Sequence, residues 1–110
     1  MGQRTLAGAD LSALRAEYDR KVHRTLPARA REAGDWPIRA DHCFARVVLD
    51  SVFGDVWDDH VEGRPAYRHL SADELRAAID IADRMLDGGR PVVVELNANS
   101  LRRRDADCRA

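Results

Sequence analysis

The chain has 110 residues, of which 45% are hydrophobic and 34% charged, and its formal net charge is −1. This length suits one domain with a single modest core. The nearly balanced charge provides no global attraction to nucleic acid or to an anionic membrane surface.

The composition also predicts a reduced, cytoplasmic protein. No stretch is long and apolar enough to span a membrane, and the first eight residues lack the apolar core of a signal peptide. Two cysteines, Cys43 in a predicted core helix and Cys108 in a polar segment, do not suggest a disulfide. A thiol near a helix N-terminus can act as a nucleophile, but burial is the interpretation we favour for Cys43.

The N-terminal segment predicts one amphipathic helix. Residues 1–9 show no periodicity and are expected to be mobile, whereas Asp10 can cap a helix over residues 10–24. Apolar residues recur on one face of this helix at Leu11, Leu14, Tyr18 and Val22. His23, near its end, is expected to interact with the helix dipole.

A short second helix and an extended connection are predicted next. Pro27 interrupts the periodic pattern, and residues 28–33 predict a short helix that ends at Gly34. Trp36 and Pro37 then predict extended backbone, because proline disfavours the helical conformation in the residue before it.

The central helix is predicted over residues 41–53. Asp41 is well placed as its N-cap, and Gly54 can supply the left-handed residue that ends it. Its apolar positions predict a mostly buried helix: Phe44, Val47, Val48, Leu49, Val52 and Phe53.

A polar stripe lies beside this apolar face, because His42, Arg46 and Asp50 are spaced four residues apart. One interpretation is a solvated helix side with an Arg46–Asp50 pair. The other is functional: His42 transfers protons, its pKa lowered by the positive helix end, and Arg46 binds an anion.

The segment after the central helix predicts irregular structure. Asp55 can cap a short helical turn over residues 56–61, in which Trp57 is expected to fill the core. Residues 64–70 predict an ordered connection, because Pro65 restricts the backbone and Tyr67 offers an apolar ring to bury.

Two further helices complete the prediction. Residues 71–74 read Ser-Ala-Asp-Glu, a capping box that opens a helix over 72–86. That helix is expected to end at Gly88 and Gly89. Residues 91–101 contain three consecutive valines typical of a strand, but no second strand is available for pairing, so we predict a helix followed by a polar tail over 102–110.

The motifs that define common cofactor sites are absent from the sequence: it contains no phosphate loop, dinucleotide fingerprint, nucleophile elbow or HExxH motif. We therefore predict no cofactor. The cysteines and histidines are too scattered for a zinc site. An iron site could still combine His42, His60 or His69 with Asp58 or Asp59, but no spacing requires it, and we predict no metal.

The arginines around the central helix predict a site for a small anion. Arg39 precedes the helix, Arg46 lies on it and Arg64 follows it, so the three could converge near its N-terminus, together with Tyr67. The candidate substrate-binding residues are thus Arg39, Arg46, Arg64 and Tyr67. The candidate catalytic residues, which would move a proton, are His42, Asp41 and Asp50. The alternative is that these arginines only solubilise the surface.

Three segments of the chain carry a resemblance. Residues 36–46 read W-P-I-R-A-D-H-C-F-A-R, and they occur together with residues 64–67 and the helix over 75–86. This combination resembles a small bacterial and fungal group of uncharacterised helical-domain sequences. The resemblance covers about the central half of the chain and implies that residues 36–67 form a unit, but it implies no reaction.

Together, these observations predict an all-α fold: a compact single-domain bundle of four or five helices over residues 10–101, built around the helix 41–53. The predicted function is a small soluble enzyme, or a catalytic accessory subunit, that acts on a small anionic metabolite by acid and base chemistry. A biosynthetic pathway fits this prediction better than central metabolism, because no cofactor motif is present. The alternative is a helical module that binds a protein partner or a second copy of itself. A nucleic-acid contact through residues 101–104 ranks last, because Asp105 and Asp107 follow immediately.

Overall fold

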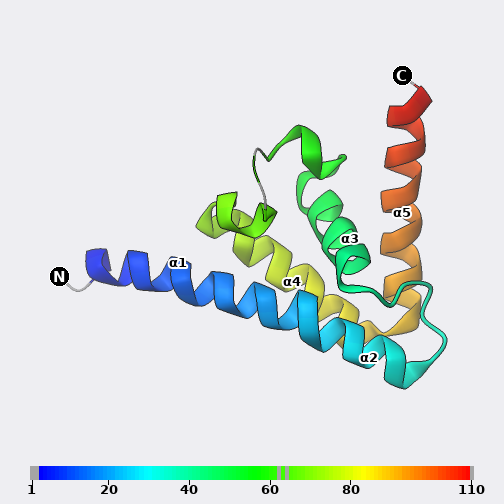
Figure 1. Ribbon diagram of the computed structural model, residues 1–110, viewed down its shortest axis with the longest axis horizontal. Coiled ribbons are helices and arrows are strands. Elements are labelled where there is room, and N and C mark those ends of the chain that lie inside the picture. The colour runs from blue at the N-terminus through cyan, green and yellow to red at the C-terminus, as the bar shows by residue number, and fades with distance from the viewer. Residues whose placement is uncertain (1–2, 62, 64, 110) are drawn as a thin grey trace.

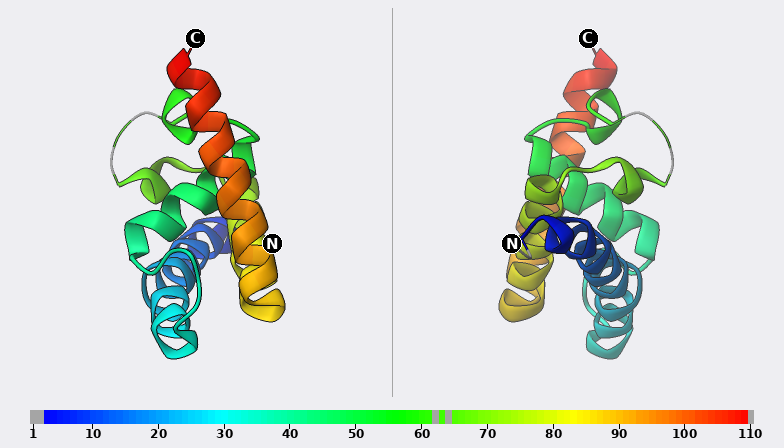
Figure 2. Two further views of the ribbon diagram at one scale, coloured as in Figure 1. Left: turned by 90° about the vertical axis from the view of Figure 1, so that its right-hand side faces the viewer. Right: turned by 90° about the vertical axis from the view of Figure 1, so that its left-hand side faces the viewer.

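The computed structural model describes residues 3–61, 63 and 65–109, and throughout these ranges the fold is all-α, with no strand. Figures 1 and 2 show the arrangement of the helices. They are α1 (Gln3–Arg20), α2 (Leu26–Ala33), α3 (Asp41–Phe53), α4 (Ala72–Gly88) and α5 (Arg90–Arg109). The predicted small all-α bundle is confirmed. No helix in the described part of the chain is both long and apolar enough to cross a membrane.

The first two helices form one continuous rod, joined by the π-helical turn η1 (Lys21–Thr25). In η1 the backbone N–H of Leu26 donates to the carbonyl of Lys21, five residues back. The predicted interruption at Pro27 is therefore wrong. Proline lacks an N–H and its ring crowds the carbonyl four residues earlier, and the wider π turn directly before Pro27 accommodates both restrictions. The helix also begins at Gln3, upstream of the predicted cap Asp10.

Helix α3 lies at the centre, as predicted, and contacts η1, α4 and α5. Its buried apolar side chains join those of the other helices in one core, and α5 packs beside it at one end of the molecule (Figures 1 and 2). Gly54 ends the helix in the left-handed conformation, with φ of 65°. The residue in the N-cap position is Ala40, so Asp41 is the first helical residue and not the cap.

The predicted capping box of α4 is confirmed. The Ser71 hydroxyl accepts from the backbone N–H of Glu74 at 3.1 Å, and the Glu74 carboxylate accepts from the N–H of Ser71 at 2.8 Å. The helix ends at Gly88, and α5 begins only two residues later. The predicted helix over 91–101 is thus confirmed, although α5 continues through Arg109 into the segment expected to be a polar tail.

The sharp corner between α4 and α5 requires glycine at position 88. A Cβ atom there would lie 2.2 Å from Cγ2 of Val92, well inside van der Waals contact. The corner directs α5 back along α3, where Val93 and Leu96 enter the core. The same packing brings polar residues of the second half of α5 against α3.

Candidate functional site

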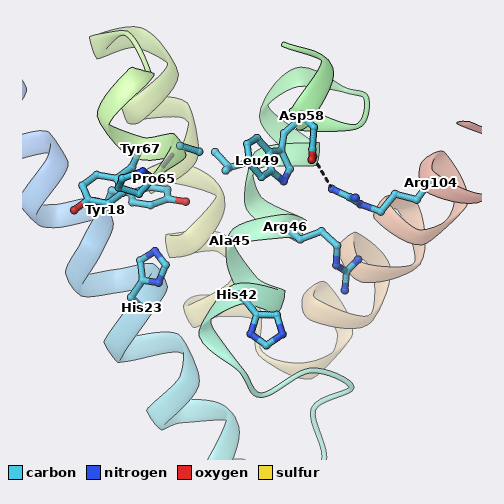
Figure 3. Close-up of a pocket in the computed structure, with 12 residues that line it drawn as sticks. Tyr18, His23, His42, Ala45, Arg46, Leu49, Asp58, Pro65, Tyr67 and Arg104 are labelled. Atoms are coloured by element: carbon cyan, nitrogen blue, oxygen red, sulfur yellow. Dashed lines mark ion pairs between the residues drawn. The ribbon is translucent and has the colours of Figure 1, made fainter. Parts of the chain in front are cut away.

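A pocket of about 350 Å³ opens where α3 meets the N-terminal rod, α5 and the two short 3₁₀ turns η2 (Trp57–Asp59) and η3 (Ala66–His69). Figure 3 shows tyrosine rings on one side, arginines on the other, and Leu49 and Ala45 of α3 between them. The residues that line it are Tyr18, His23, His42, Ala45, Arg46, Leu49, Trp57, Asp58, Pro65, Ala66, Tyr67 and Arg104. Three of the predicted site residues, His42, Arg46 and Tyr67, therefore share this pocket.

Arg46 is held in place by neutral groups of α5. Its Nη1 donates to Oγ of Ser100 at 2.8 Å, and its Nη2 donates to Oδ1 of Asn97 at 2.9 Å. Within the described ranges, no carboxylate pairs with this guanidinium, so the Arg46–Asp50 pair considered from the sequence is not formed. The side chain is half-buried, and among the described residues its direct partners are neutral.

Asp50 has a different role from the one predicted. Its side chain is fully buried, and its carboxylate accepts from Nε and Nη2 of Arg104 at 2.9 and 3.0 Å. It also accepts from Oγ of Ser100 at 2.6 Å and from the backbone N–H of Trp57 at 3.0 Å. Every position around the carboxylate is thus occupied by a donor of the protein, and Asp50 does not line the pocket. It fastens α3 to α5 and η2.

The Arg104 guanidinium closes the wall of the pocket next to Asp58, whose Oδ1 lies 3.6 Å from Nη2 (Figure 3). Burial lowers the pKa of Arg104, but the hydrogen bonds and charge of Asp50, with a smaller contribution from Asp58, more than offset it and raise the pKa overall. Arg104 therefore stays charged and paired.

A histidine and a carboxylate form a pair on the opposite side. Nδ1 of His23, in η1, lies 2.9 Å from Oδ2 of Asp41, the first residue of α3. The hydrogen bond with His23, followed by the bond that Asp41 accepts from the N–H of His42, lowers the pKa of the Asp41 carboxyl. Asp41 is ionised at neutral pH and can fix the orientation of the His23 ring.

Two tyrosines restrict the His23 ring further. Tyr18 is buried and packs edge-on against it, with ring centroids 5.9 Å apart, and Tyr67 stacks on Tyr18 at 5.6 Å. Burial, with a smaller effect of Asp19, raises the pKa of Tyr18 far above its usual value, so this phenol stays neutral. Tyr18 and Tyr67 thus form an aromatic wall of the pocket, and His23 lies at its edge.

The predicted proton-transfer residue, His42, is much less constrained. Its side chain is 83% exposed, and its Nδ1 lies 3.9 Å from the nearer Asp41 oxygen, which is too far for a hydrogen bond. Oδ1 of Asp41 instead accepts from the backbone N–H of His42 at 2.9 Å. The structure thus places His42 at the rim, without an orienting partner in the described part of the chain.

The two predicted arginines that the structure describes, Arg39 and Arg46, do not converge. The side chain of Arg39 donates to the carbonyl of Gly34 at 3.2 Å and lines a neighbouring hollow, which shares His23 with the pocket. Arg64 lies outside the described residues. Of the two arginines that the structure describes, Arg46 lines the pocket and Arg39 does not.

The structure does not assemble the alternative iron site. In the described ranges, no group of three or more His, Cys, Asp or Glu side chains is arranged to hold a metal ion. His60, one of the candidate ligands, instead bonds Asp55 at 3.3 Å and stacks on Phe53. Cys43 is half-buried against the core, in agreement with the interpretation favoured from the sequence.

Two important residues of the site, His23 and Arg104, were not predicted from the sequence. His23 lies in the π turn η1, and the proline that follows was the one local indication of irregular helix there. Arg104 is 54 residues from Asp50, and no local pattern predicts that pairing.

Comparisons with protein-family models, with curated proteins and with solved structures find no significant match.

Proposed function

We propose that this protein binds a small organic anion in the pocket between α3, α5 and the N-terminal rod, and acts on it by acid and base chemistry. It would then be a small enzyme or the catalytic accessory subunit of one. The observation that carries the proposal is the Arg46 guanidinium, which is charged, half-buried and bonded only to Ser100 and Asn97 among the described residues.

The chemistry of arginine supports an anionic ligand. A guanidinium has five N–H donors, and the hydrogen bonds to Ser100 and Asn97 account for two of them. A carboxylate or phosphate that accepts from the others would form charge-assisted hydrogen bonds in a partly desolvated place. The fixed position of Arg46 lowers the entropic cost of such binding.

The apolar part of the lining favours an organic ligand over an inorganic ion. Leu49 and Ala45 lie between the arginines and the aromatic wall, and Trp57 and Ala66 also contribute. A pocket of about 350 Å³ is at the small end of the range for ligand sites. These features suit a compact molecule with an anionic group at one end and an apolar body.

The acid and base step has two candidate histidines. His23 is oriented by Asp41, whereas His42 is exposed and free to rotate. An oriented imidazole next to a carboxylate is the usual arrangement for proton transfer, so His23 with Asp41 is the stronger candidate.

The test is an NMR titration of the protein with benzoate, a small carboxylate with a flat apolar body. We expect saturable shifts at α3, α5 and η3, and an R46Q protein that binds roughly ten- to a hundredfold more weakly, because one charge-assisted hydrogen bond is worth about 1.5–3 kcal/mol. The control is R39Q, which removes an exposed arginine outside the pocket. Equal binding by R46Q and the original protein would contradict the proposal.

A second candidate function, a helical interaction module, is favoured by one observation. Val94 and Leu101 are 38% and 50% exposed and lie seven residues apart, on one side of α5. Size-exclusion chromatography with light scattering would test self-association, and a V94S/L101S protein should abolish any dimer formed through this side.

A further inference from the structure

The hydrogen bond between His23 and Asp41 determines which nitrogen of the His23 ring carries the proton. The Asp41 carboxylate is an acceptor only, so a neutral His23 must carry its proton on Nδ1, where the bond of 2.9 Å is formed. The other ring nitrogen, Nε2, then presents a lone pair. In the described part of the chain, no donor is bonded to it.

This lone pair belongs to a side chain that lines the pocket. The His23 side chain is 27% exposed and is confined between Tyr18, Tyr67 and the start of α3. Figure 3 places it on the side opposite Arg46, with α3 between the two. Both side chains line the same pocket, Arg46 as a cationic donor and His23 as a ring that Asp41 orients.

We infer that the ligand is a small cyclic hydroxycarboxylate, whose carboxylate binds Arg46 and whose hydroxyl donates to Nε2 of His23. This inference rests on the proposed function, because it adds a second recognition point to the same pocket. The apolar ring of such a molecule would lie over Leu49, beside the aromatic wall. In a proton transfer at this point, the hydroxyl O–H bond breaks, the proton forms an N–H bond at Nε2, and the electron pair stays on the oxygen.

Asp41 acts here as a positioning residue. It keeps the proton on Nδ1, and in a D41N protein the amide could donate to Nδ1 and move the ring proton to Nε2. The tautomer can be read without any ligand, from the ¹⁵N chemical shifts of the His23 ring at a pH where the ring is neutral. We expect Nδ1–H in the original protein and a shift toward Nε2–H in D41N.

The binding test compares benzoate with meta- and para-hydroxybenzoate. One net hydrogen bond should make the better hydroxybenzoate bind roughly three- to tenfold more tightly than benzoate. The advantage should disappear in H23N, whose side chain can replace Nδ1 but not Nε2, and should return in part in H23Q, whose amide can reach the Nε2 position. Amide spectra of each variant would verify that it is folded.

The matched control is H60N, because His60 forms a histidine–aspartate pair with Asp55 outside the pocket. H60N should keep the full advantage of the hydroxyl group. If benzoate and both hydroxybenzoates bind equally, or if H23N keeps the advantage, the inference is overturned while the proposed function stands. If none of the three probes binds, both are overturned.

Discussion

Two arginines bridge α3 and α5 at the same pocket, and they differ in the charge of the groups to which they are bonded. Arg104 makes two hydrogen bonds to the buried carboxylate of Asp50, whereas Arg46 is bonded to a hydroxyl and an amide. Buried charge is tolerated when it is paired, so the first arginine holds the fold together. The second is bonded to neutral groups, and the proposed function assigns its charge to an external anion.

The largest expected effect comes from substituting Arg104 with glutamine, and R46Q is the comparison. R104Q leaves the Asp50 carboxylate buried without its cation, so we expect a loss of about 3 kcal/mol in the free energy of unfolding. R46Q leaves no buried charge unpaired among the groups that Arg46 contacts, so it should cost less, about 1.5 kcal/mol. Urea denaturation of both variants checks the comparison, and equal losses would refute it.

A smaller effect is expected at Ser100, which connects the two arginines. Its Oγ donates to Asp50 at 2.6 Å and accepts from Arg46 at 2.8 Å. S100A removes a buried hydrogen bond to a charged group and should lower the free energy of unfolding by about 2 kcal/mol. S51A offers a control, because the Ser51 hydroxyl only bonds the carbonyl of Val47 within its own helix. A cost for S100A no greater than that for S51A would show that the network is unimportant.

The smallest effect concerns pH and the pair on the other side of the pocket. The folded-state pKa of Asp41 lies below its value in the unfolded chain, about 3.9. Its contribution to stability is therefore complete above the unfolded pKa and is lost as the pH falls through the folded pKa. The stability difference between the original protein and D41N should shrink over that acidic range in denaturation measurements. A difference that does not change with pH would argue against an ionised Asp41 in the pair.

The sequence was sufficient to predict what depends on local patterns. The buried helix 41–53, its glycine stop and the capping box at Ser71 follow from residue spacing and are confirmed. The helix at 91–101 was less evident, because three valines favour a strand until the lack of a partner strand is considered. Its extension to Arg109 was missed, because charged residues alone do not indicate where a helix ends.

The site was predictable only in part, because it depends on distant packing. The helical wheel placed His42, Arg46 and Asp50 on one stripe, but α5 packs against that stripe and buries Asp50 while leaving His42 exposed. Residues four apart on a helix differ by about 40° around its axis, so His42 and Asp50 are about 80° apart, which is enough to bury one and expose the other. The role of His23 depends on a π turn, which no periodic pattern predicts.

The most direct measurement for the central claim is to follow the guanidinium ¹⁵N signals of both arginines while benzoate is added. We expect the Arg46 side-chain signals to shift along a saturation curve and those of Arg104, already held by Asp50, to change little. If the Arg46 signals do not respond, or if only those of Arg104 do, Arg46 is not the anion-binding group and the proposed function is wrong.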